Sequence, residues 1–138
     1  MPEATIVWGN GKMELSGTHL RYLYAIYEIS QDAPDVRSAS VAEKLRVSRP
    51  SVARMLGALA EEGLVVKEPY GRILLTEEGL CVAEEFSLRV HLLEERIPRM
   101  GLELSEEDVF ETARAVAAIL PDGAWRRTPR GGIRRPAV

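Results

Sequence analysis

The sequence predicts a mainly α-helical fold with a small β-hairpin wing, a winged helix-turn-helix followed by a helical domain. Apolar residues recur at helical spacing, a tight turn near residue 47 separates two shorter helical patterns, and two β-type runs flank a Pro-Tyr-Gly sequence. With 138 residues, 46% of them hydrophobic, the chain is long enough for one core and a helical appendage. We expect a leader, a winged helix-turn-helix, a helical domain and a basic tail, over residues 1–17, 18–75, 76–121 and 122–138.

The first helix follows a leader that lacks a sustained apolar period. Three glycines interrupt residues 1–17, so we expect only partial order there. Over residues 18–30 an amphipathic helix is predicted by apolar side chains at i, i+3, i+4 and i+7, namely Leu20, Leu23, Tyr24 and Tyr27.

Two capping signals predict the next two helices. Ser40 followed by Glu43 is a capping-box pattern, so a short helix should begin at Ser40 and end near Leu45. Ser48 is the next capping residue, and Pro50 fits a first helical turn, where its missing amide hydrogen costs nothing. The third helix should bury Val52, Met55, Leu56 and Leu59 and end at Gly63. Its outward side should then carry Arg49, Pro50, Ala53, Arg54 and Gly57.

The remaining elements are a hairpin, two helices and a tail. Residues 64–66 and 73–75 are β-type runs, so a hairpin with a basic, aromatic tip is expected between them. Thr76 should cap a helix over about residues 77–97, with an apolar stripe of Leu80, Ala83, Leu88, Leu92 and Leu93. Ser105 should begin the last helix. Beyond Pro121 we expect disorder, because the tail is rich in arginine and glycine.

Composition excludes several classes of protein. No apolar run approaches the roughly 20 residues that a membrane-spanning helix needs, and no secretory signal is present, so the cytoplasm is the expected compartment. The one cysteine, Cys81, excludes an intramolecular disulfide, and we expect it to pack as a small apolar side chain. We do not expect an enzyme, because the sequence has no nucleophile with a base at workable spacing and no phosphate-binding glycine loop.

The net charge of −3 hides a segregation of charge along the chain. Residues 36–72 carry seven basic and four acidic side chains, whereas residues 77–111 carry eleven acidic side chains and three arginines. Phosphate binding depends on the field over one face, so a basic module joined to an acidic one can still bind DNA.

The order of the elements predicts DNA binding, because the second helix of such a motif can enter the major groove. Near the start of that helix lie the residues expected at the base edges and phosphates: Ser48, Arg49, Pro50, Ser51 and Arg54. At the hairpin we expect contacts with the phosphate backbone from Lys67, Tyr70 and Arg72. The alternatives are a solvated helix face and an exposed turn that contacts nothing.

Four blocks resemble the DtxR/MntR family of metal-dependent repressors: Val41-Ala42-Glu43-Lys44-Leu45, Val47-Ser48-Arg49-Pro50-Ser51-Val52, Glu62-Gly63-Leu64-Val65 and Leu75-Thr76-Glu77-Glu78-Gly79. The similarity covers about residues 18–121. It implies a winged-helix domain and a helical dimerisation domain, acting as a homodimer on a palindromic operator in double-stranded DNA. The length matches the short, two-domain form typical of the manganese-responsive branch.

The resemblance also implies a manganese or iron site, but the residues at the matching positions differ from the family's ligands. The family uses carboxylates, a histidine and a Glu/Cys-x-x-Glu-His cluster, whereas this chain has Arg21, Tyr24, Val90, Arg114, Ala117 and Ala118. One hypothesis is that Arg21 and Arg114 supply fixed positive charge in place of the cation and pair with nearby acids. The alternative is that both arginines point to solvent.

Two further possibilities remain open from the sequence. His91 and Glu95 are spaced i, i+4 on one helix and are weak candidates for a relocated metal site, although two protein ligands alone would bind weakly. The winged helix can also serve as a protein-interaction module, or as a regulator that responds to an organic ligand.

Overall fold

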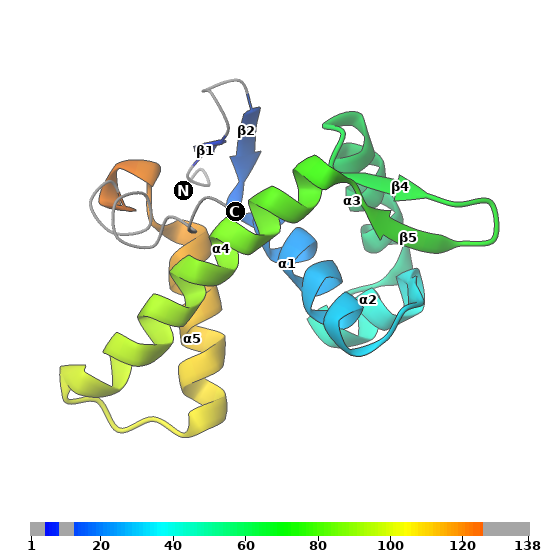
Figure 1. Ribbon diagram of the computed structural model, residues 1–138. Coiled ribbons are helices and arrows are strands. Elements are labelled where there is room, and N and C mark those ends of the chain that lie inside the picture. The colour runs from blue at the N-terminus through cyan, green and yellow to red at the C-terminus, as the bar shows by residue number, and fades with distance from the viewer. Residues whose placement is uncertain (1–4, 9–12, 126–138) are drawn as a thin grey trace. The chain divides into compact units, whose positions relative to one another are not determined.

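The computed structural model describes residues 5–8 and 13–125 (Figure 1). Within them the chain forms two compact units, one of residues His19–Ala83 and one that combines the N-terminal segment with the chain from Glu84 onward. The N-terminal hairpin and the C-terminal helices therefore group together. No helix among the described residues is long and apolar enough to cross a bilayer. The arginines expected in the tail, residues 126–135, lie outside the described residues.

Three helices form most of the His19–Ala83 unit: α1 Gly17–Asp32, α2 Ser38–Leu45 and α3 Arg49–Glu61. The amphipathic pattern of α1 is confirmed, since Leu20, Leu23 and Tyr24 are buried. Tyr27 is only half-buried, and its ring stacks on that of Tyr24 at 6.0 Å between centroids. The packing of α2 against α3 buries Val41 and the predicted α3 residues Val52, Leu56 and Leu59.

The predicted start of α2 is wrong. The helix begins at Ser38 and not at Ser40, and Arg37 occupies the capping position without a side-chain cap. The physical reason is a short strand, β3 Val36–Arg37, which pairs with the hairpin and leads directly into the helix. Strand pairing thus fixes the backbone that enters the helix, and the helix starts two residues before the predicted capping box.

The wing is the hairpin of β4 Val65–Lys67 and β5 Arg72–Leu75, and β3 adds a third antiparallel strand in the order β3-β5-β4. The Gly71 amide donates to the Glu68 carbonyl, which closes a turn with Pro69 at its second position. Gly71 then has φ +87, a left-handed conformation that glycine adopts without strain. The hairpin projects from the three helices (Figure 1).

The base of the wing is held where α3 ends and α4 Glu77–Arg96 begins. Gly63 has φ +76, and the amides of Gly63 and Leu64 donate to the carbonyls of Ala60 and Leu59, so the predicted glycine stop is confirmed as a Schellman motif. Thr76 caps α4 as predicted, because its Oγ1 accepts from the Gly79 amide at 2.9 Å. The same hydroxyl donates to the Gly63 carbonyl at 2.6 Å, which ties the two helix ends together.

The second unit contains an N-terminal hairpin that the sequence does not predict. Strands β1 Thr5–Trp8 and β2 Met13–Ser16 pair in antiparallel register, with Thr5 opposite Ser16. Leu15 of β2 is fully buried. Strand β1 lies beside a short 3-10 helix, η2 Asp122–Trp125. The leader is therefore partly a β-structure that packs with residues more than a hundred positions away.

The helices of this unit follow the predicted order. The C-terminal part of α4 leads into η1 Ile97–Met100, which ends at Gly101 with φ +82. Helix α5 Glu106–Ile119 begins after Ser105, whose hydroxyl accepts from the Asp108 amide at 3.1 Å, so this cap is confirmed. On α5 the buried residues are Val109, Ala113, Ala117 and Ala118.

The buried face of α4 differs from the predicted stripe. Of the five predicted residues only Ala83 is buried, and Leu80 is 38% exposed. The buried residues of α4 are Gly79, Val82, Ala83, Phe86, Ser87, Arg89 and Val90. Cys81 lies on the exposed side, so the prediction that it packs as a core residue is wrong.

Arg89 and Trp125 form a contact that the sequence interpretation missed. Arg89 is fully buried, and its guanidinium lies over the Trp125 ring, 5.1 Å from the ring centroid. A cation over an indole face is attracted by the negative face of the π-system. Trp125 is 3% exposed, so the predicted disorder directly beyond Pro121 is wrong for residues 122–125.

Candidate nucleic-acid interface

The turn between α2 and α3 sets the direction of the third helix. Arg46 ends α2 in a left-handed conformation, with φ 57 and ψ 46. Ser48 is extended, and its hydroxyl accepts from the Ser51 amide at 3.2 Å, which confirms the predicted cap. Pro50 lies in the first turn of α3, as predicted.

Three polar side chains at the start of α3 are linked to one another. Ser48 Oγ donates to Ser51 Oγ at 2.9 Å, and Arg54 Nη2 donates to the same Ser51 oxygen at 3.3 Å. These bonds lie at the surface, where water and phosphate compete with them. They orient Arg54 along the first two turns while it remains exposed.

The outward side of α3 is the side that the sequence predicts. Arg49, Pro50, Ala53, Arg54 and Gly57 are all exposed, whereas Val52, Leu56 and Leu59 are buried behind them. Met55, the fourth predicted core residue, is half-buried. The helix therefore presents two guanidiniums, with small residues between them that allow close approach of another surface.

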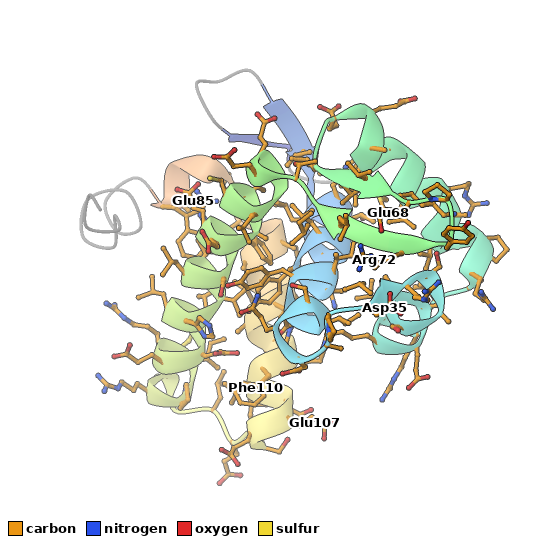
Figure 2. The ribbon with its side chains drawn as sticks, turned by 45° about the vertical axis from the view of Figure 1, so that its right-hand side comes forward. Asp35, Glu68, Arg72, Glu85, Glu107 and Phe110 are labelled. Atoms are coloured by element: carbon orange, nitrogen blue, oxygen red, sulfur yellow. The ribbon has the colours of Figure 1, made fainter. Side chains whose placement is uncertain are left out.

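The wing presents a second set of exposed groups. Tyr70 at its tip is 88% exposed, and Lys67 is exposed at the end of β4. Arg72 is also exposed, but its Nε lies 2.7 Å from Glu68 Oε1 (Figure 2). The hydrogen bond with Glu68, and then the charge of Glu68, raise the pKa of the Arg72 guanidinium above its ordinary value. The structure thus brings Arg72 to the wing but pairs it with a carboxylate.

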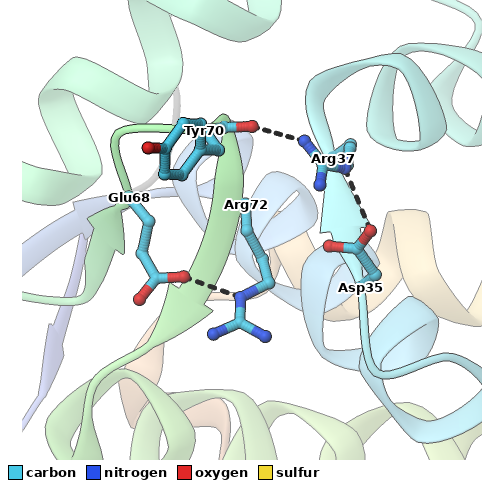
Figure 3. A network of polar contacts seen from close by, with 5 residues as sticks. All are labelled: Asp35, Arg37, Glu68, Tyr70 and Arg72. Carbon is cyan, nitrogen blue, oxygen red and sulfur yellow. Dashed lines mark hydrogen bonds and ion pairs between the residues drawn. The ribbon is translucent and has the colours of Figure 1, made fainter.

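Arg37 is a residue of this surface that the sequence interpretation missed. It lies on β3 directly opposite Arg72, and its Nη1 donates to the Tyr70 carbonyl (Figure 3). The sequence gives little indication of β3 because the strand has only two residues. Two residues cannot show the alternation of apolar and polar side chains that predicts a strand. The adjacent Asp35, Val36 and Arg37 carry no other mark of a strand.

The positions that match the family's metal ligands do not fit a divalent cation. Val90 and Ala117 are fully buried and apolar, Ala118 is 4% exposed, and none of the six side chains is a carboxylate, imidazole or thiolate. Manganese and iron sites use such donors. Across the described residues, no group of three or more His, Cys, Asp or Glu side chains is placed to hold a metal ion.

The structure also gives the surroundings of His91, Arg21 and Arg114, the other residues considered for an effector site. His91 is exposed, and its Nδ1 lies 2.9 Å from Glu94 Oε1, whereas the sequence suggested Glu95 as its companion. Arg21 on α1 and Arg114 on α5 are half-buried and each has interaction partners. A pairing of the two arginines with nearby acids stays a prediction.

Comparison with known proteins supports the winged-helix interpretation. Residues 14–73 match the family model described as iron dependent repressor, N-terminal DNA binding domain. The transcriptional regulator MntR of Escherichia coli O6:H1 is 32% identical over 59% of this chain. The HTH-type transcriptional regulator MntR of Geobacillus kaustophilus is 27% identical over 80% of this chain and 75% of its own length.

Among solved structures, the manganese regulator SloR has a TM-score of 0.67 and 28% identity, over 81% of this chain and 52% of that one. The chain also spans only about half, 52%, of the length of the Escherichia coli relative. The shared domain is the one that carries α3 and the wing. Its sequence match, the related regulators and the agreement in fold place this domain of the chain in the DtxR/MntR-like family.

Proposed function

We propose that this chain is a DNA-binding transcriptional regulator, with repression as its mode of action. The observation that carries the proposal is the exposed, arginine-bearing side of a capped α3, beside a wing whose tip is exposed. Exposed guanidiniums at a helix start can bind guanine edges bidentately or bind phosphates. The proposed role is one of binding and not of catalysis. It also implies that the protein acts in the cytoplasm, where bacterial DNA is found.

In the proposed complex, α3 enters the major groove through its first two turns. Arg49 and Arg54 contact bases or phosphates, and the Ser48 and Ser51 hydroxyls contact the backbone near the helix start. Lys67 and Tyr70 at the wing approach the neighbouring phosphates. Arg72 adds less to the positive field than its sequence suggests, because Glu68 neutralises it in the free protein.

The second unit is proposed to form a homodimer, so that two copies of α3 read a palindromic operator. It exposes several large apolar side chains, including Phe110, which projects from α5 (Figure 2). The others are Met100, Leu102, Leu104 and Ile119, with exposed fractions between 41% and 68%. Exposed apolar side chains of this size support an interface between copies, because large exposed apolar patches are rare on small monomers.

DNA binding is further proposed to be independent of the divalent metals that the related regulators are named for. The support is chemical: the six matching positions offer no carboxylate, imidazole or thiolate, and three of them are buried apolar side chains. Val90, Ala117 and Ala118 can stabilise their own unit by apolar packing without an ion.

The central test measures binding to a random-sequence duplex at several salt concentrations between about 50 and 200 mM, by fluorescence anisotropy. We expect log K to fall linearly with log salt concentration, with a slope of about 0.9 per phosphate neutralised. Arg49→Gln and Arg54→Gln should each reduce that slope by about 0.9 if the side chain meets a phosphate.

Arg99→Gln is the matched control, since Arg99 is an exposed arginine on η1 that the proposal does not use. It should leave the slope unchanged. Binding that is absent at low salt, or that does not weaken as salt rises, would refute the DNA-binding proposal and favour a protein-interaction module.

A further inference from the structure

Arg37 belongs to the helix-turn-helix scaffold and not to the wing. It is the last residue of β3 and the capping residue of α2, with extended backbone at φ −129 and ψ 159. Its Cα is therefore fixed by strand pairing on one side and by a helix on the other. Any group that its side chain holds is tied to that scaffold.

The side chain of Arg37 reaches the tip of the wing, 33 residues away in sequence. Its Nη1 donates to the backbone carbonyl of Tyr70, and its Nε donates to Asp35 Oδ2 at 3.0 Å (Figure 3). Asp35 thus orients one edge of the guanidinium while the other edge holds the tip. A planar fork with fixed donors suits this double contact better than the single ammonium of lysine.

The glycine of the tip supplies a second, independent observation. A Cβ added to Gly71 would lie 3.4 Å from Arg37 Nη1, so the guanidinium lies directly against the backbone of the turn. Apart from this contact, two backbone bonds close the turn, from the Gly71 amide to the Glu68 carbonyl and from the Glu68 amide to the Arg72 carbonyl, and the side chains of Arg72 and Glu68 pair across it.

Charge also accounts for the arrangement around Arg37. Arg37 and Arg72 face each other across β3 and β5, where two like charges repel. Asp35 pairs with the first arginine and Glu68 with the second, so positive and negative groups alternate. The alternation keeps Arg37 beside the wing despite the arginine opposite it.

We propose that Arg37 is a positioning residue that holds the wing tip in place for DNA, an inference that rests on the proposed function. It fixes the backbone at Tyr70, a residue that is 88% exposed, so the Tyr70 side chain stays accessible to the duplex. Arg37 acts through Tyr70 and Gly71 and does not contact the DNA itself. Rigid presentation lowers the ordering cost that a mobile loop meets on binding.

The first measurement is amide hydrogen exchange in the free, full-length protein, with Arg37→Gln, Arg37→Lys and the control Arg99→Gln. In Arg37→Gln we expect the Glu68 and Gly71 amides to exchange about five-fold faster, the effect of losing roughly one net hydrogen bond. Arg37→Lys should rescue part of that change. The exchange rate of the Gly63 amide, at the base of the wing, should not change. Unchanged exchange rates of the Glu68 and Gly71 amides in Arg37→Gln would overturn the proposal that Arg37 holds the tip.

The second measurement is DNA affinity and its salt dependence for the same variants. We expect Arg37→Gln to bind about three- to ten-fold more weakly with an unchanged salt slope, whereas a direct phosphate contact would lower the slope by about 0.9. A lowered slope, or faster exchange at the tip with unaltered affinity, would overturn the positioning role. If the wild-type chain bound no duplex, the proposed function would fail, while exchange would still decide whether Arg37 holds the tip.

Discussion

Gly79 offers the sharpest test of the packing at the base of the wing. It is buried in the first turn of α4, and a Cβ added there would fall on the Leu64 carbonyl, 2.9 Å from its carbon and 3.2 Å from the Leu64 Cα. The obstacle is backbone, which cannot rotate away as a flexible side-chain end would. Ordinary contact begins at 3.4 Å, so α4 or the wing must shift in the variant Gly79→Ala.

Two destabilising effects and one stabilising effect determine the expected change in the free energy of unfolding of Gly79→Ala. Overpacking against a fixed backbone costs about 1–3 kcal/mol. Displacement also weakens the bond from the Thr76 amide to the Leu64 carbonyl, 3.0 Å long in the wild type, at about 1 kcal/mol. Alanine regains up to about 1 kcal/mol of helix propensity. The net expectation is a loss of about 2 kcal/mol in the free energy of unfolding.

Gly57→Ala is the matched control, because Gly57 lies in the middle of α3, is exposed and has no atom within 4 Å of an added Cβ. It should raise the free energy of unfolding by up to about 1 kcal/mol. Both variants are unfolded in urea at one protein concentration and followed by circular dichroism, since oligomerisation makes stability concentration-dependent. Equal midpoints for the two variants, or a more stable Gly79→Ala, would refute the close approach of α4 to Leu64.

Four further outcomes are expected. Ser48→Ala should lower the free energy of unfolding by about 1 kcal/mol, measured in urea, because it removes the cap on the Ser51 amide; no change would argue against that cap. Glu68→Gln should raise affinity for random duplex about two- to five-fold and steepen its salt dependence, because Arg72 loses its paired carboxylate. Operator affinity should be the same in EDTA and in manganese, and a tenfold drop with the chelator would contradict metal independence. Sedimentation should show a dimer at micromolar concentration, and a monomer would contradict the assembly.

Local rules predicted the parts of the fold that depend on neighbours in sequence. Ser48 and Pro50 marked the start of α3 because capping and the missing amide hydrogen act within one turn. Gly63 marked its end because a left-handed residue is needed there. The exposed side of α3 followed from the apolar period of Val52, Leu56 and Leu59, which the structure confirms as core.

The missed parts depend on distant partners. Strand β3 exists because Val36 pairs with Ile73, and no signal within two residues reveals that pairing. The N-terminal hairpin likewise packs beside η2, and the Arg89 guanidinium lies over the ring of the buried Trp125. Arginine is rarely buried, so the apolar pattern of the sequence does not include Arg89 in the core. The predicted stripe of α4 therefore differs from the residues that the structure buries.

The contacts around Leu64 have a mechanical consequence. Its amide closes the end of α3, its carbonyl receives the Thr76 amide, and Gly79 leaves that carbonyl no room to move. The end of α3 and the first turn of α4 are thus joined through a single residue, Leu64. A displacement of either of these two helix ends therefore has to displace Leu64, so we expect the end of α3 and the start of α4 to shift together.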